Sequence, residues 1–113
     1  MTTKEKVKRV REGRELDPKE LVRQIGVMNV LAISGGRTAA ILDGENYVIG
    51  LQLPCGANRQ VEITLNFWDT YTVRRYRTIV KGEQRGEDIL EFEQDMVYCD
   101  EIAEVAYRAS IWR

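Results

Sequence analysis

The chain of 113 residues contains no histidine, two cysteines and two prolines. Histidine is the usual general base and the usual partner of a catalytic serine or cysteine, so its absence argues against an enzyme. Cys55 and Cys99 are far apart and lack the spacing of zinc or haem motifs. We therefore expect no metal and no cofactor.

Long apolar runs are also absent. No stretch approaches the roughly 20 apolar residues that a membrane-spanning helix requires. The first fourteen residues are charged and contain no apolar segment of the kind found in signal peptides. The sequence therefore predicts a cytoplasmic protein that does not interact with membranes.

Charge is segregated along the chain, although the net charge is only −1. Residues 74–81 carry four cations and no acid, whereas residues 83–104 carry nine acids and one arginine. Patches of opposite sign favour self-association. The alternative is that they are solvated faces of separate elements.

The N-terminal third contains one clear helix signal. Residues 1–15 lack apolar periodicity and are interpreted as a charged arm, whereas residues 16–113 are expected to form a single domain. Asp17 can cap a helix, Pro18 suits its first turn, and Gly26 suits its end.

The next segment is apolar nearly throughout. Residues 27–33 predict a buried strand because glycine bounds them, and residues 38–42 predict another. Between them stand Ser34, Gly35, Gly36 and Arg37. A hairpin turn is the simpler interpretation of the two glycines. The alternative is a loop whose backbone amides, with Arg37, bind phosphate.

The rest of the chain predicts further strands and a final helix. Residues 61–65 alternate strictly, and a short loop containing Phe67 and Trp68 joins them to a second strand from residue 70. Residues 47–53 and 88–94 also read as strands, the latter with Leu90 and Phe92 pointing inward. Residues 98–109 have helical periodicity. The predicted fold is α+β, with an antiparallel sheet of about six strands, an N-terminal helix and a C-terminal helix.

Cations and aromatic rings alternate in one part of this sheet: Trp68, Tyr71, Arg74, Arg75, Tyr76 and Arg77. Rings stack on bases and guanidinium groups bind phosphate, so the pattern indicates a site for a small anionic ligand such as a nucleotide. The alternative is that these arginines pair with the acids of residues 87–95. Long duplex DNA is not expected, because the net charge is slightly negative.

Four blocks of sequence carry a resemblance to a known family: IGVMNVLAISGGR at residues 25–37, DTYTVRR at 69–75, VKGE at 80–83, and VYCDEIAEVAYRAS at 97–110. In order and spacing these blocks resemble the phage anti-Thoeris sponges. Proteins of that family sequester cyclic ADP-ribose signals made by bacterial TIR-domain proteins. The resemblance spans residues 25–110.

The resemblance implies a non-enzymatic protein that forms a dimer or a hexamer and holds cyclic ADP-ribose isomers in recessed pockets at subunit edges. Matched position by position, it assigns phosphate binding to Arg37, Arg75 and Arg108, and stacking to Phe92, Tyr98 or Trp68. Arg77 joins them from the cationic strand. The resemblance also implies a second nucleotide site for cyclic oligonucleotides, which we place at Ser34, Gly35, Gly36 and Arg37.

Two departures from the family pattern affect these assignments. Phe67 and Trp68 stand where the family has a polar turn, and the segment between Lys81 and Tyr98 is longer. The leading hypothesis is a phage protein that traps a cyclic nucleotide signal and blocks the host's Thoeris or CBASS-type response. The alternatives are a single-stranded nucleic-acid-binding accessory protein and a nucleotide hydrolase.

Overall fold

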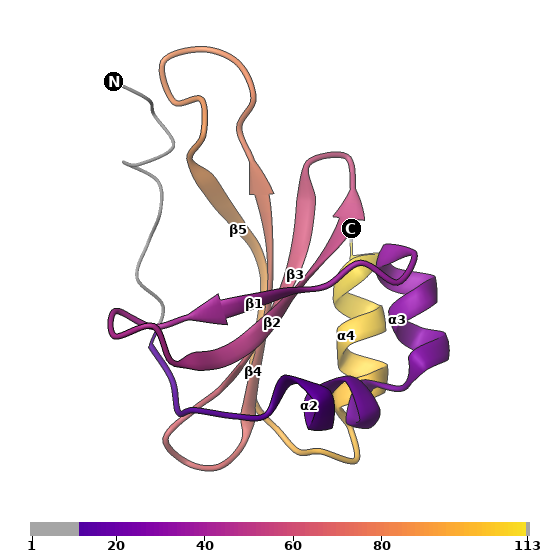
Figure 1. Ribbon diagram of the computed structural model, residues 1–113. Coiled ribbons are helices and arrows are strands. Elements are labelled where there is room, and N and C mark those ends of the chain that lie inside the picture. The colour runs from indigo at the N-terminus through magenta and orange to yellow at the C-terminus, as the bar shows by residue number, and fades with distance from the viewer. Residues whose placement is uncertain (1–11, 113) are drawn as a thin grey trace.

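Residues 12–112 are described by the computed structural model, in which helices pack against an antiparallel sheet (Figure 1). Within these residues the sheet has five strands in the order β1-β2-β3-β4-β5, so each strand pairs with its neighbour in sequence. The α+β prediction is confirmed, with five strands rather than about six. The elements are α2 (Pro18–Ile25), α3 (Val27–Ser34), β1 (Ala39–Leu42), β2 (Val48–Gly56), β3 (Arg59–Leu65), β4 (Tyr71–Thr78), β5 (Asp88–Val97) and α4 (Ile102–Ser110).

The predicted N-terminal arm lies mostly outside the described residues, which begin at Glu12. Its described part runs along the sheet. The amide of Arg14 donates to the carbonyl of Leu65 at 2.8 Å, and the amide of Leu16 donates to the carbonyl of Val48 at 2.9 Å. The chain is therefore already bound to β2 and β3 before α2 begins.

Helix α2 begins and ends where the sequence predicts. The Asp17 carboxylate accepts a hydrogen bond from the amide of Lys19 at 2.9 Å, and Pro18 is the first helical residue. Gly26 ends the helix with a φ of 92°, a conformation that glycine adopts without strain. Leu21 and Ile25 point into the core.

The prediction of a strand over residues 27–33 is wrong, because this segment forms α3. Val30, Ile33 and Ser34 are buried, and the last two lie three and four residues after Val30, which places all three on one face of a helix. The other side of α3 is also apolar, so the sequence shows no polar face from which helical periodicity could be recognised. The sheet has one strand fewer as a result.

The pair of glycines ends α3 and does not form a hairpin turn. Gly35 is left-handed, with a φ of 66°. Its amide donates to the carbonyl of Leu31 at 2.9 Å, and the amide of Gly36 donates to that of Val30 at 3.4 Å. This is the usual glycine-terminated helix end, in which two carbonyls without helical partners are satisfied.

The core lies between the helices and the central strands. On β3 the predicted core positions Val61 and Ile63 are fully buried, but the prediction of a half-buried strand is wrong, because Glu62 and Thr64 on the other face are buried too. Gly50 of β2 permits close pairing with β3, because a β-carbon there would lie 2.0 Å from the carbonyl oxygen of Ile63.

Helix α4 packs its predicted apolar stripe on the sheet. Ile102, Val105 and Ala109 are buried, as the periodicity indicated. The helix begins four residues later than expected, since residues 98–101 form a turn. Tyr98 therefore lies outside the helix and is exposed.

The pairing of β4 with β5 contains two irregularities that the sequence did not indicate, one between Tyr71 and Val73 and one between Arg75 and Tyr76, and the second bears on the site. Arg75 of β4 pairs with Phe92, and the next residue, Tyr76, pairs with Leu90, so Glu91 is an extra residue in β5. Because neighbouring residues of β4 face opposite sides of the sheet, Phe92 and Leu90 do too. Leu90 is largely exposed, so the prediction that it points inward is wrong.

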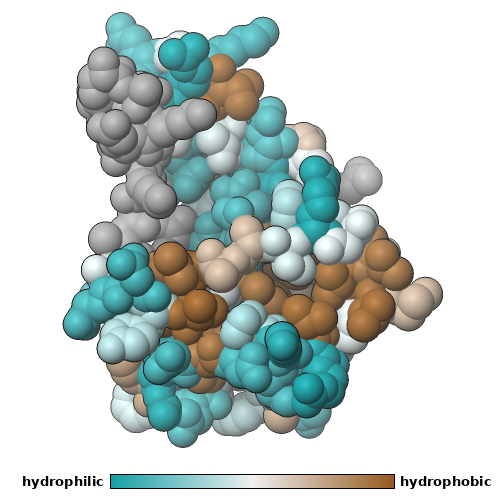
Figure 2. Space-filling model, viewed as in Figure 1, coloured by the Kyte–Doolittle hydropathy of each residue, from teal (hydrophilic) through white to brown (hydrophobic). Residues whose placement is uncertain are grey.

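The outer surface of α3 is apolar. Figure 2 shows hydrophobic side chains gathered over this helix, at the right of the view. They include Val27, Met28 and Leu31, of which Met28 is 78% exposed. Within the described part of the chain, no helix is both long enough and apolar enough to cross a membrane.

Candidate anion-binding pocket

A cavity of about 570 Å³ lies where the C-terminal end of α4 meets the sheet. Arg59 of β3, Arg75 of β4 and Glu91 of β5 line it from the sheet. Cys55, near the end of β2, and Trp112, which follows α4, line it from its other sides. The pocket thus combines side chains from five elements or their ends.

Three guanidinium groups converge on one carboxylate beside this cavity. Glu91 accepts from Arg59 Nε at 2.9 Å and from Arg77 Nε at 3.1 Å, and Arg75 Nη2 lies 3.0 Å from Glu91 Oε1. Arg59 and Arg77 are directly opposite each other on β3 and β4. Three cations and one carboxylate leave this cluster with a net charge of +2.

Arg75 is the most buried of the three, with 6% of its side chain exposed. Its Nε has no hydrogen-bond partner among the described residues. Each guanidinium carries five N–H donors, whereas one carboxylate offers about four acceptor positions. The cluster therefore has many more donors than acceptors.

The titratable groups of the pocket respond to this charge. Partial burial acts to raise the pKa of the Glu91 carboxyl, but the hydrogen bonds from Arg59 and Arg77 and the charge of Arg75 outweigh it, so this pKa is lowered. Burial raises the pKa of the Cys55 thiol despite the opposing charges of Arg75 and Arg59. Cys55 therefore remains a thiol at neutral pH and is a poor nucleophile.

An aromatic pair flanks the cluster. The rings of Phe92 and Trp112 meet edge to face, with centroids 5.0 Å apart and an angle of 61° between their planes. Phe92 also packs against the core, which fixes one side of the pair. Trp112 remains 44% exposed, so its ring can contact a ligand.

Of the predicted site residues, the structure brings Arg75, Arg77 and Phe92 together. Arg108 lies on the exposed side of α4, and its Nη2 donates to Gln94 Oε1 at 2.9 Å. It is close to β5 but has no contact with Glu91, and, like Arg77 and Phe92, it is not among the residues that line the pocket.

Trp68 and Tyr98 lie at the opposite end of the hairpin. Arg59 pairs with Arg77 at one end of β3 and β4, whereas Trp68 is in the turn at the other end. Tyr98 follows Val97, which pairs with the first residue of β4, so it shares that distant end. The two rings that the sequence assigned to the ligand are therefore separated from the arginine cluster.

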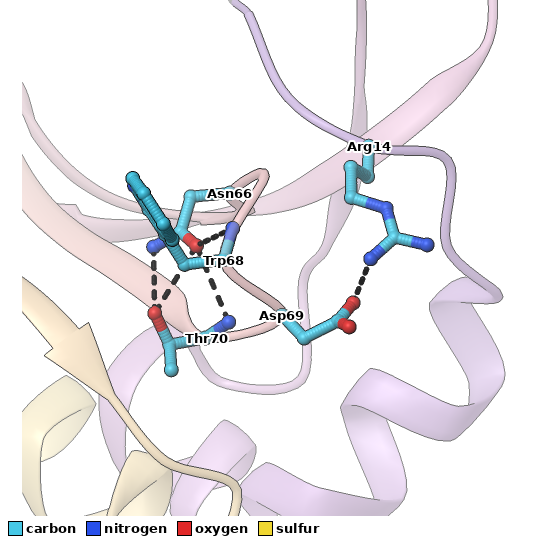
Figure 3. Close-up of polar contacts among 5 residues, drawn as sticks. All are labelled: Arg14, Asn66, Trp68, Asp69 and Thr70. Carbon is cyan, nitrogen blue, oxygen red and sulfur yellow. Dashed lines mark hydrogen bonds and ion pairs between the residues drawn. The ribbon is translucent and has the colours of Figure 1, made fainter.

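The turn that carries Trp68 is held by polar contacts (Figure 3). Asn66 Oδ1 accepts hydrogen bonds from the amides of Trp68 and Thr70, at 2.9 and 3.2 Å. Asp69 pairs with Arg14. In Figure 3 the indole points away from that ion pair, and the Trp68 residue is 79% exposed. The turn is held by hydrogen bonds between the Asn66 side chain and backbone amides rather than by packing of the rings of Phe67 and Trp68.

The polar groups of the predicted second site already form hydrogen bonds within the protein. The amides of Gly35 and Gly36 cap α3, and the Arg37 Nε donates to the carbonyl of Ser34 at 3.3 Å. The Ser34 hydroxyl bonds to the carbonyls of Val30 and Arg37. These amides do not form an open phosphate-binding loop in this structure.

The interpretation in which the arginines pair with acids of the return strand is also borne out. Arg74 Nε donates to Glu93 at 2.6 Å on the other face of the sheet, while Arg75 and Arg77 pair with Glu91. On the pocket side, however, three cations share one acid. The residues that sequence reasoning did not assign to the site are Arg59, Glu91, Cys55 and Trp112.

The fold and site define a small α+β protein with a cationic, aromatic pocket at the end of its last helix. Comparison with family models, with curated proteins and with solved structures found no match to this chain.

Proposed function

We propose that this protein binds a small nucleotide anion in the pocket at the end of α4 and retains it without chemical change. The observation that carries the proposal is the buried Arg75, whose Nε has no partner within the described residues. Leaving a buried donor unsatisfied costs about 1–3 kcal/mol. A phosphate group bound beside Arg75 would neutralise the excess positive charge of the cluster, and a small movement of the Arg75 side chain would let a phosphate oxygen accept from Nε, which is shielded from solvent in the free protein.

The aromatic pair supports a ligand that carries a base as well as phosphate. Stacking of one base on an exposed ring contributes about 1–3 kcal/mol. Trp112 provides such a ring next to the arginines, and the edge-to-face contact with Phe92 holds that ring in place. The cavity of about 570 Å³ lies within the range of about 300–1,000 Å³ typical of small-molecule sites.

The biological part of the proposal rests on the sequence resemblance. The protein would act as a phage anti-defence protein in the host cytoplasm, sequestering cyclic ADP-ribose isomers. Retention without turnover suits a chain with no histidine and a pocket thiol that stays protonated. Arg59 and Arg75, which line the pocket, would bind phosphate, and Arg77 would act next to them through its contact with Glu91.

Self-association is part of the same proposal. Val27, Met28 and Leu31 form an exposed apolar face on α3, and Ile111, which is 56% exposed, lines the pocket itself. Covering such a face with a second copy removes apolar surface from water. Leu31→Glu should lower the mass measured by light scattering. Tyr47→Glu, at an exposed residue of the β1–β2 turn, is the control and should not.

Calorimetry with cyclic ADP-ribose, followed by heat denaturation and mass spectrometry, tests the function. Return of the intact nucleotide supports sequestration. Return of a cleaved product identifies a hydrolase. Absence of binding, with uptake of an oligothymidylate that weakens steeply with salt, would instead identify a single-strand-binding protein.

Two neighbouring arginines provide a matched pair of variants for locating the site. Arg75→Met removes the buried guanidinium, whereas Arg74→Met removes an arginine on the other face, paired with Glu93. Only the first should weaken binding, by about 30-fold or more. The thiols give a second measurement: bound ligand should slow modification of Cys55, which lines the pocket, but not of the exposed Cys99.

A further inference from the structure

Glu91 occupies the place in the arginine cluster that an anionic ligand would need. Its two oxygens accept from Arg59 and Arg77, and Arg75 Nη2 lies 3.0 Å from one of them. With 18% of the side chain exposed, it is the one acid among the described residues that line the pocket. A phosphate group approaching these guanidiniums meets a carboxylate that already holds one donor from each.

We infer that Glu91 is an internal competitor of the ligand, so that an anion binds by taking over donors that Glu91 holds in the free protein. The inference rests on the proposed function and adds a residue that sets how tightly the pocket binds. A carboxylate ligand would offer no more than Glu91 itself offers. A diphosphate presents more acceptor oxygens and more charge, which makes it the class of anion able to displace Glu91.

Glu91 also has a structural role in the protein without ligand. Arg59 and Arg77 are directly opposite each other, and like charges in that position destabilise a sheet. Glu91 offsets their repulsion by accepting from both. Because its pKa is lowered, it stays ionised at neutral pH, and the competition persists there.

The test uses inorganic pyrophosphate and cyclic ADP-ribose as probes, with calorimetry on three proteins. Glu91→Gln removes the competing charge and keeps the size of the side chain. Glu93→Gln makes the same change on the same strand, but its partner is Arg74 on the other face. We expect Glu91→Gln to tighten binding of both probes about tenfold or more, and Glu93→Gln to change it less than about twofold.

A double variant separates displacement from a simple change of charge. Arg77→Gln with Glu91→Gln leaves two cations and no acid, so the cluster keeps the net charge of +2 that it has in the wild type. Competition predicts that this variant still binds pyrophosphate more tightly than the wild type. Because it loses one arginine together with the acid, the double variant carries less uncompensated positive charge than Glu91→Gln alone. It therefore remains informative if circular dichroism shows that Glu91→Gln does not fold.

The outcomes distinguish the inference from the function on which it rests. If the wild type binds a probe and both variants that carry Glu91→Gln bind it equally or more weakly, the inference is overturned. The proposed function then still stands, and Glu91 is a ligand contact or a structural residue. If neither probe binds to the wild type or to any folded variant, both fail. Tighter binding by the double variant supports both.

Discussion

Replacing Arg75 by methionine distinguishes a binding role from a structural role for this buried cation. The side chain is 6% exposed and its Nε is unsatisfied within the described residues. Burying such a donor costs about 1–3 kcal/mol, and removing a guanidinium from water costs several kcal/mol more. Methionine is of similar length and uncharged, so the substitution removes both costs.

The substitution loses the ion pair between Arg75 and Glu91. Removing one partner of a buried pair usually costs about 3–5 kcal/mol, because the other charge is left alone. Here Glu91 keeps Arg59 and Arg77, which donate to its two oxygens at 2.9 and 3.1 Å. We therefore expect the free energy of unfolding to stay within about 1 kcal/mol of the wild type or to rise. Anion affinity should fall about 30-fold or more, as when a buried charged contact is truncated.

Urea denaturation without ligand at pH 7, followed by far-ultraviolet circular dichroism, measures the stability. Arg74→Met is the control, because its ion pair with Glu93 is partly exposed and contributes at most about 1 kcal/mol. If Arg75→Met lost about 3 kcal/mol or more while Arg74→Met did not, Arg75 would be a structural residue. The reasoning that assigns its unsatisfied nitrogen to a ligand would then be refuted.

Two further predictions concern the fold around the site. Gly50→Ala should destabilise the protein by about 3 kcal/mol in urea denaturation, because the new β-carbon would lie 2.0 Å from a backbone oxygen of β3; a loss below about 1 kcal/mol would contradict this close pairing. The lowered pKa of Glu91 predicts an acid-dependent loss of stability. Its contribution is full above the unfolded value of 4.5 and is lost as pH falls through the lower folded pKa. Thermal midpoints measured against pH should therefore fall less steeply in acid for Glu91→Gln than for Glu93→Gln, and equal slopes would exclude this contribution.

The parts of the fold that the sequence predicted are those with local physical signals. Asp17, Pro18 and Gly26 mark the ends of α2 through capping and backbone geometry, which act within a few residues. Val61 and Ile63 of β3 could be recognised as core residues from their spacing of two, but no local signal showed that Glu62 and Thr64 on the other face are buried as well. By contrast, α3 is apolar on its exposed side as well, so the sequence shows neither the period of a helix nor that of a strand.

The candidate site could be predicted in part. Arg75, Arg77 and Phe92 stand out because cations and rings alternate along their strands. Arg59 could have been added, since the pairing of Leu65 with Tyr71 across the turn places it opposite Arg77. Trp112 had no such signal. Its place beside Phe92 depends on how far α4 runs along the sheet, which is set by tertiary packing.

The extra residue in β5 explains why Glu91 escaped prediction and why the pocket exists in its present form. In a regular strand Glu91 and Glu93 would share the face opposite Phe92, next to Arg74. The bulge instead leaves Glu91 among Arg59, Arg75 and Arg77, while Glu93 pairs with Arg74 as regular alternation requires. One inserted residue thus converts an acid of a solvated strand into the counter-ion of the buried Arg75 and of its partly exposed neighbours Arg59 and Arg77. Removing the bulge would return Glu91 to the other face and leave the three cations without it, so the charge of the pocket depends on strand register as much as on composition.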